Sequence, residues 1–136
     1  MSLSIIIVTA ERTLLEETSI VRAKITTDLG ELGVEVGHTP LLAKLKPGIL
    51  EYTDLDNTKV EFYINGGLLE VQPNKITVLA DSGLRSEELD AEAIAKAEQA
   101  AQALADSATD KLDRSAALAQ LAALAVQKQL LKRRGL

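Results

Sequence analysis

The chain lacks cysteine and tryptophan, and it has only one phenylalanine, two tyrosines and one histidine among its 136 residues. Without cysteine it cannot form a disulfide, a thiolate zinc site or a cysteine nucleophile. A single histidine cannot supply a multi-histidine metal site. The scarcity of aromatic residues and the net charge of −5 argue against a stacking platform for single-stranded nucleic acid, so we expect no nucleic-acid partner.

The sequence also lacks the ~18 to 20 continuous apolar residues that a membrane-spanning helix needs. The N-terminal run Ile5–Val8 is short and has no cationic flank. It is therefore typical of a β-branched strand and not of a secretion signal. We expect a soluble intracellular protein, and the absence of cysteine fits a reducing compartment.

The composition changes abruptly near residue 85. Residues 1–85 contain seven of the eight glycines, all three prolines and all three aromatic residues, whereas 15 of the 19 alanines lie between Ala91 and Ala125. This change predicts a β domain over residues 1–85 and a helical domain over residues 86–136.

Apolar and polar residues alternate in several segments of the first part. Apolar residues occupy every second position in Val21–Ile25, Val60–Ile64 and Ile76–Ala80, although Leu79 interrupts the polar face of the last segment. Turn-forming residues separate these segments. Many short strands with no long helix between them predict an antiparallel sandwich or a flattened barrel.

Two helices are expected in the second part. Asp90 can cap a first helix that ends near Ala105, and Asp110 can cap a second helix that ends near Arg134. Apolar stripes predict that the two helices pack as an antiparallel hairpin with a seam of small residues. The stripe residues are Ile94, Ala97, Ala101 and Leu104 on the first helix and Leu118, Leu121, Ala122, Ala125 and Leu131 on the second.

The seam of this hairpin should be weak, because contacts between alanines bury little apolar area. The alanines nevertheless keep each helix stable by itself. Residues 86–113 contain two basic and eight acidic residues, a net charge of −6, whereas residues 114–136 contain five basic and no acidic residues. The basic segment can neutralise the acidic helix, or it can leave that helix for another acidic surface, and both hold if the hairpin has two positions.

No arrangement of residues indicates an active site. The sequence has no P-loop, no GxGxxG fingerprint and no GxSxG turn that would place His38 in a catalytic triad. No pair of carboxylates is set apart as a general acid and base. We therefore expect a protein that is not an enzyme and has no metal or cofactor. Glycines and prolines over residues 30–48 build a loop region that presents Glu31, Val34 and His38, either as tight connections or as a contact surface.

Four short motifs resemble the epsilon subunits of bacterial F-type ATP synthases in order and spacing. They are Gly30-Glu31-Leu32-Gly33, Gly37-His38-Thr39-Pro40-Leu41, Gly66-Gly67-Leu68-Leu69-Glu70-Val71 and Thr77-Val78-Leu79-Ala80. Each motif alone is weak, but the set covers nearly the whole chain together with the helical hairpin after Leu89-Asp90. The resemblance implies a β-sandwich of about ten strands followed by two antiparallel helices.

The resemblance also implies a non-catalytic subunit in the central rotor stalk of a proton-translocating ATP synthase. Such a subunit binds the gamma subunit and the c-ring at the cytoplasmic face of the bacterial cell membrane, and it meets the membrane only through the complex. Glu31 and His38 match the loop region of the family that faces the c-ring and the base of gamma.

The helices of this family can extend along gamma and inhibit ATP hydrolysis. Their basic face then contacts acidic segments of the alpha and beta subunits. The candidates for these contacts are Arg114, Lys128, Lys132, Arg133 and Arg134.

Some members of the family bind ATP through the motif Ile/Leu-Asp-x-x-Arg-Ala at the start of the first helix. The corresponding stretch here is Leu89-Asp90-Ala91-Glu92-Ala93-Ile94, in which Ala93 stands at the position of the arginine. A charge-assisted contact is therefore missing, and we expect ATP binding to be absent at physiological concentrations.

Two other functions stay open at the level of the sequence. One is an unrelated adaptor that docks partner helices on its alanine-rich hairpin. The other is a small-ligand sensor or enzyme that uses the β domain, for which the sequence offers no site.

Overall fold

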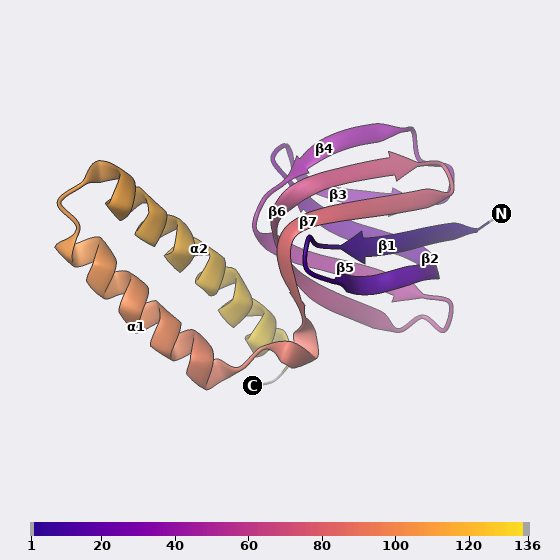
Figure 1. Ribbon diagram of the computed structural model, residues 1–136. Helices are drawn as coiled ribbons and strands as arrows, with labels where there is room; N and C mark the ends of the chain where they lie inside the picture. The colour runs from indigo at the N-terminus through magenta and orange to yellow at the C-terminus, as the bar shows by residue number, and fades with distance from the viewer. Residues whose placement is uncertain (1, 135–136) are drawn as a thin grey trace. The chain divides into compact units, whose positions relative to one another are not determined.

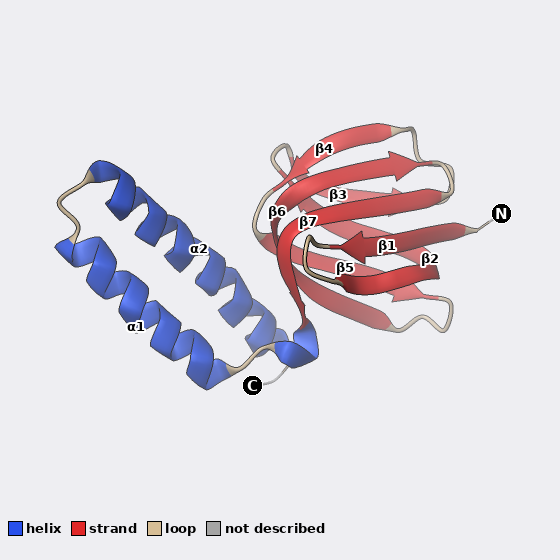
Figure 2. Cartoon of the chain, viewed as in Figure 1, coloured by secondary structure: helices blue, strands red, loops and turns tan. Residues whose placement is uncertain are grey.

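The computed structural model describes residues 2–134, which form a β unit and a helical unit (Figure 1). The chain divides into these two compact units between Arg85 and Ser86. The β unit consists of β1 (Leu3–Val8), β2 (Thr13–Thr27), β3 (Gly30–Glu35), β4 (Leu41–Leu45), β5 (Gly48–Asp54), β6 (Lys59–Gln72) and β7 (Lys75–Arg85). The helical unit consists of a 3-10 turn (Ser86–Glu88), α1 (Ala91–Ser107) and α2 (Lys111–Arg133), as Figure 2 shows.

The strands of the β unit close on themselves. β1 pairs in parallel with β7, β7 pairs with β6, and β5 joins β6 to β2, which pairs back with β1. β3 pairs with β2 and β4 pairs with β6, and a short pairing joins β2 to β4. The predicted sandwich or flattened barrel is therefore confirmed, with the difference that the β1–β7 pairing is parallel.

The described residues contain seven strands, whereas the resemblance implied about ten. The number is smaller because β2 spans 15 residues and β6 spans 14, and each pairs with different strands along its length. In β6, Gly66 and Gly67 have φ angles of 72° and 120°, and the ladder with β7 omits a pair at Gly66 while its register stays the same on both sides. A Cβ atom at Gly67 would lie 2.1 Å from the carbonyl oxygen of Leu79. The close approach of β6 to β7 at this position therefore requires glycine.

Aliphatic side chains from several strands fill the interior of the β unit. The largest fully buried residues include Ile5, Ile25, Leu50, Leu69 and Ile76. Tyr52 and Phe62 stack in the same cluster with their ring centroids 6.1 Å apart. Because each buried aliphatic side chain stabilises the fold by about 1.5–3 kcal/mol, the β unit has a hydrophobic core of its own.

Both predicted helix caps are confirmed. Asp90 Oδ1 accepts a hydrogen bond from the Glu92 backbone N–H at 3.0 Å, and Asp110 Oδ1 accepts one from the Leu112 N–H at 2.9 Å. Neither helix of the described chain is long and apolar enough to span a membrane.

The predicted apolar stripes are only partly correct. Ile94, Ala101 and Leu131 are buried as expected, whereas Leu104 and Leu118 are exposed. Exposed positions also include Ala122 and Ala125, and α2 instead buries Ala117, Ala123, Leu124 and Leu130. Alanine and leucine occur on every side of α2, so the spacing of apolar residues does not single out the face that is buried.

Candidate functional site

Apolar side chains project outward from four neighbouring strands of the β unit. Because alternate residues of β6 and β7 point into the core, Leu68 and Leu79 point outward, and they lie directly opposite each other in the β6–β7 ladder. Val8 of β1 pairs with Leu79, and Lys44 of β4 pairs with Leu68. One continuous row therefore crosses four strands and carries three apolar side chains.

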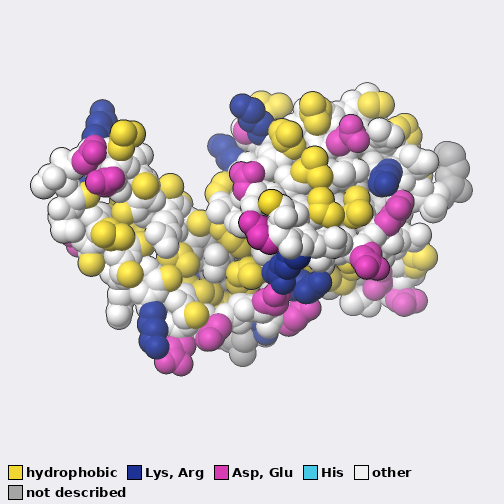
Figure 3. All heavy atoms as spheres, in the orientation of Figure 1, with side chains coloured by type: hydrophobic (Ala, Val, Ile, Leu, Met, Phe, Trp, Pro, Cys, Tyr) yellow, Lys and Arg dark blue, Asp and Glu magenta, His cyan; other side chains and the backbone are white. Residues whose placement is uncertain are grey.

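The adjacent row adds Leu42 of β4 and Ile6 of β1 to the same outward surface. We call the set Ile6, Val8, Leu42, Leu68 and Leu79 the apolar face. Its three leucines are 69%, 44% and 50% exposed in chain order. Figure 3 shows hydrophobic side chains among charged ones on the side of the β unit where β4, β6, β7 and β1 face the viewer. Neighbouring exposed apolar side chains of this kind are typical of surfaces that contact other proteins.

Sequence reasoning did not identify the apolar face, although the sequence contains a signal for it. Leu79 stands where the alternation of β7 calls for a polar residue, and Ile5–Val8 is apolar at successive positions, hence on both sides of its strand. Both observations predict a strand that is covered on its outer side as well as on its inner side.

Glu31 lies near the tight turn between β2 and β3. The turn is held by the Thr27 hydroxyl, which donates to the Gly30 carbonyl at 2.8 Å, and by the Asp28 N–H, which donates to the Lys44 carbonyl at 3.0 Å. At its tip the side chain of Leu29 is 87% exposed. The turn therefore presents the apolar side chain of Leu29 and two exposed acidic residues, Asp28 and Glu31, on a backbone that is fixed by hydrogen bonds.

His38 lies beyond the other end of β3, in the loop that leads to β4. The loop is fixed by the Gly37 N–H, which donates to the Pro73 carbonyl at 2.6 Å, and the imidazole Nδ1 lies 2.7 Å from the Thr39 carbonyl oxygen. His38 lines a shallow cavity of about 470 Å³ together with Arg22 and Lys24 of β2. The lining thus contains two basic side chains, Arg22 and Lys24, and one acidic side chain, Glu35.

The structure does not bring Glu31 and His38 together, and Val34, which the sequence predicts to be presented beside them, is instead buried in the core. Glu31 pairs with Thr26 at the start of β3, and Glu35 pairs with Arg22 at its end. At a rise of about 3.3 Å per residue, the length of β3 between Glu31 and Glu35 alone is roughly 13 Å. The two predicted contact residues therefore belong to opposite ends of the β unit.

Lys128 and Arg134, two of the predicted basic contact residues, make contacts within the helical unit. Lys128 Nζ lies 3.3 Å from Glu98 Oε2 and so joins α2 to α1. The Arg134 guanidinium donates to the carbonyl oxygen of Ser86, at the start of the helical unit. In this hairpin, Lys128 and Arg134 therefore stabilise the folded position.

The other three candidates lie at two distant places on α2. Lys132 and Arg133 occupy its last turn, where positive charge is favourable near the helix C-terminus. Arg114 is exposed in the first turn, and at 1.5 Å per residue it lies about 21 Å along the helix from Lys128. Four of the five residues thus form a basic helix end, and Arg114 is separate from it.

The stretch that corresponds to the ATP-binding motif, Leu89–Ile94, lies at the start of α1. Ala93 is exposed there, and the Asp90 carboxylate already caps the helix. An alanine methyl group offers no charge or hydrogen bond to a phosphate. The local geometry thus leaves the helix start without a cationic group at the position of the motif arginine.

Comparisons with known proteins address the whole chain. Residues 2–86 match the family described as ATP synthase, Delta/Epsilon chain, beta-sandwich domain. The chain is 41% identical over 128 residues to the "ATP synthase epsilon chain" of Xanthomonas campestris pv. campestris (strain B100), which covers 93% of this chain and 90% of the relative. It is 40% identical over 108 residues to the protein of the same name from Xylella fastidiosa (strain Temecula1 / ATCC 700964), which covers 79% of this chain and 77% of that one.

Two solved structures resemble the fold. A chain of the Euglena gracilis mitochondrial ATP synthase, from a cryo-EM structure of its OSCP/F1/c-ring, has a TM-score of 0.85 and 26% identity, with 96% of this chain and 81% of that chain covered. A chain from the central stalk/c-ring of the Tetrahymena thermophila mitochondrial ATP synthase has a TM-score of 0.64, and 95% of this chain and 96% of that chain are covered. Its 15% identity supports similarity of fold alone.

Proposed function

The chain belongs to the epsilon-chain family of F-type ATP synthases, and from this premise we propose that it couples the gamma subunit to the c-ring and restrains ATP hydrolysis through its helical hairpin. It is a non-catalytic subunit of the central stalk. Membership of this family removes the alternative of an unrelated adaptor. The observation that carries the proposal is the apolar face on the β unit.

We assign the apolar face to contact with gamma. Leu68 and Leu79 are opposite each other at the centre of the face, and Lys44 and Glu70 border them. An apolar centre with a polar rim is the usual composition of a protein–protein interface. Covering the exposed leucines with gamma would remove apolar surface from water.

The two ends of the β unit are assigned to different contacts. The tip with Leu29 and Glu31 is small, exposed and rigidly held, which suits contact with the c-ring. The cavity with His38 suits the base of gamma, because Arg22 and Lys24, which line it together with Glu35, can pair with acidic side chains there. Through such contacts the chain would be a peripheral protein at the cytoplasmic face of the membrane, attached only through the complex.

Inhibition is assigned to the basic side chains of α2, which would contact acidic segments of the alpha and beta subunits when the hairpin extends. Lys128 and Arg134 have partners in the folded hairpin, Glu98 and the Ser86 carbonyl. They would therefore have to exchange these partners for acidic groups on alpha and beta. The contacts of the folded hairpin and the inhibitory contacts would then compete for the same two cations. The hairpin would therefore have two alternative positions.

Truncation of the chain after Ser86 tests the coupling and the inhibitory roles separately. The truncated chain keeps the complete core of the β unit, so we expect it to assemble with gamma and the c-ring. We expect ATP hydrolysis by the truncated complex to rise above that of the complex with the full chain. Unchanged hydrolysis would remove the inhibitory role, and failure of the folded β unit to assemble would remove the coupling role.

A further inference from the structure

The segment that enters the helical unit contains two alternative starts for its first helix. In the structure, α1 begins after Asp90, whose φ of −123° and ψ of 116° are extended and whose carboxylate caps the helix. Ser86 lies four residues earlier and is also of a type that helices prefer as an N-cap. Ser86–Glu88 instead form a short 3-10 turn, which Figure 2 shows apart from α1.

The sequence that follows Ser86 favours a longer helix. Residues 86–107 contain neither glycine nor proline, the two residues that interrupt helices most strongly. Glu87 and Glu88 would lie in the first turn of a helix that begins at Ser86, where negative charge is favourable. Asp90 would then lie inside the helix, where aspartate is tolerated at a small cost. Other contacts must therefore hold the 3-10 turn in the folded hairpin.

One of these contacts is made by the carbonyl oxygen of Ser86, which accepts two hydrogen bonds. The Leu89 N–H donates to it at 3.2 Å and closes the 3-10 turn, and the Arg134 guanidinium donates to it from the end of α2. In a helix capped by Ser86, the same oxygen would accept from the Asp90 N–H. Because a carbonyl oxygen has two lone pairs, Leu89 and Arg134 together occupy the acceptor that the longer helix needs.

The burial of Leu89 is the second contact that favours the 3-10 turn. Leu89 and Ile94 are only 6% and 5% exposed. In a continuous helix, five residues correspond to a rotation of about 140° around the axis, so the two side chains would lie on different faces. The extended residue Asp90 lies between them and allows both to be buried. The 3-10 turn is thus linked to the packing of the folded hairpin.

We propose that residues 86–90 are a conformational switch that follows the position of the hairpin. They form the 3-10 turn while Arg134 holds the Ser86 carbonyl, and they become the first turn of a longer α1, capped by Ser86, when α2 leaves. Release of Arg134 frees the carbonyl for the Asp90 N–H, and the rotation of the segment turns Leu89 away from the face of Ile94. This inference rests on the proposed movement of the hairpin.

NMR of the isotopically labelled full-length chain tests the switch. The coupling between the amide and α protons at position 90 distinguishes an extended φ from a helical one, and Cα shifts report helix at residues 87–90. Arg134→Gln removes the charged donor and should raise the helical population of these residues by about two- to fivefold. Lys132→Gln is the control, because it removes the same charge from an exposed position of the last turn of α2. It should leave the coupling unchanged.

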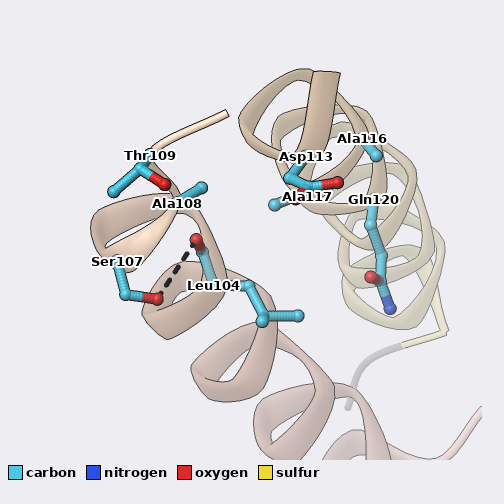
Figure 4. A pocket seen from close by; sticks show the side chains of 8 residues that line it. All are labelled: Leu104, Ser107, Ala108, Thr109, Asp113, Ala116, Ala117 and Gln120. Atoms are coloured by element: carbon cyan, nitrogen blue, oxygen red, sulfur yellow. Dashed lines mark hydrogen bonds between the residues drawn. The ribbon is translucent and has the colours of Figure 1, made fainter. Parts of the chain in front are cut away.

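Asp90→Ala tests the competition between the two caps without altering α2. It removes the later cap and should raise the helical population of residues 87–90 by about fivefold. Asp110→Ala is its control, because Asp110 caps α2 in the same way but follows the connection at the other end of α1. Figure 4 shows that connection, in which the Ser107 hydroxyl donates to the Leu104 carbonyl at 3.5 Å. The control should leave residues 87–90 unchanged.

A third substitution tests the role of Ser86 as a cap. Ser86→Ala in the Arg134→Gln chain should reverse the gain of helix, because the longer helix loses its cap while the carbonyl group is retained. Absence of a gain in both Arg134→Gln and Asp90→Ala, or equal gains in these variants and their controls, would overturn the proposal. Cα shifts that move toward those of an unfolded chain would overturn it as well.

The switch and the proposed inhibition can fail separately. NMR of the free chain involves no ATP hydrolysis, so unchanged hydrolysis after truncation at Ser86 would remove the inhibitory role and leave the switch in place. Increased hydrolysis after truncation, together with an unaltered coupling at position 90 in Arg134→Gln and Asp90→Ala, would overturn the switch and retain the inhibition.

Discussion

Lys128 of α2 and Glu98 of α1 form an ion pair across the hairpin, with 3.3 Å between Nζ and Oε2. The two side chains are 55% and 29% exposed, so solvent screens the pair and its contribution should be about 0.2–1 kcal/mol. The hairpin also buries Ile94 of α1 and Leu124, Leu130 and Leu131 of α2, together with several alanines. The ion pair therefore adds a small contribution to a hairpin that is held mainly by apolar packing.

Replacing Glu98 with glutamine should loosen the hairpin. Without the carboxylate, Lys128 loses its partner on α1, and we expect amide hydrogen exchange in α2 to accelerate by up to about fivefold. Glu92→Gln is the control, because Glu92 pairs with Lys96 on the same helix at 3.6 Å and does not join α1 to α2. Equal exchange in α2 of the two variants would show that the pair does not hold the seam.

Leu79→Glu should abolish contact with gamma without unfolding the β unit. The side chain is half exposed, so the free energy of unfolding should change by only about 0.5 kcal/mol. A charge at the centre of the apolar face should weaken binding to purified gamma by more than about tenfold, because it would be buried without a partner.

Leu55→Glu is the matched control for Leu79→Glu. Leu55 is 69% exposed but lies between β5 and β6, outside the apolar face. Its replacement should leave the affinity for gamma unchanged, as measured by calorimetry with the full chain. If both variants bind gamma like the unaltered chain, gamma docks elsewhere.

Gly67→Ala should destabilise the β unit strongly, whereas Gly33→Ala should be nearly neutral. The φ of Gly67 is 120° and a Cβ there would collide with the Leu79 carbonyl oxygen, so we expect a loss of about 3 kcal/mol or more. At Gly33, nothing lies within 4 Å of a Cβ. Urea unfolding of the two variants measures the difference, and similar midpoints would show that β6 and β7 can separate at this crossing at little cost.

The full-length chain should not bind ATP at cellular concentrations. Ala93 provides no cation, and the Asp90 carboxylate is engaged by the backbone of α1. Titration with ATP in a calorimeter should therefore give no heat of binding beyond dilution. A dissociation constant at or below the cellular concentration of ATP would contradict this prediction and would show that another group replaces the missing arginine.

Local features of the sequence predicted local features of the structure. Asp90 and Asp110 identified the helix starts because a cap depends only on residues two or three positions away. The alternation in Val60–Ile64 likewise indicated a strand. The buried face of α2 could not be predicted in the same way, because burial depends on the position of α1 and alanine is tolerated on either side.

The candidate site could not be predicted fully from the sequence, because it depends on pairing between strands that are distant in the chain. The exposed position of Leu79 becomes part of a surface only when β1 and β6 lie beside β7. Glu31 and His38 are close in sequence, but the extended strand between them separates their side chains. Sequence proximity therefore suggested one region, whereas the structure places the two residues apart.

The parallel pairing of β1 with β7 has a consequence for biosynthesis. Val8 leaves the ribosome long before Leu79, its partner in β7; at ~5–20 residues per second the delay is roughly 4 to 14 s. During this time β1 can pair with β2, but its other edge stays open to strands of unrelated nascent chains. The second edge of β1 is thus covered only when β7, the last strand, has been made, and the run Ile5–Val8 has the longest wait for its partner.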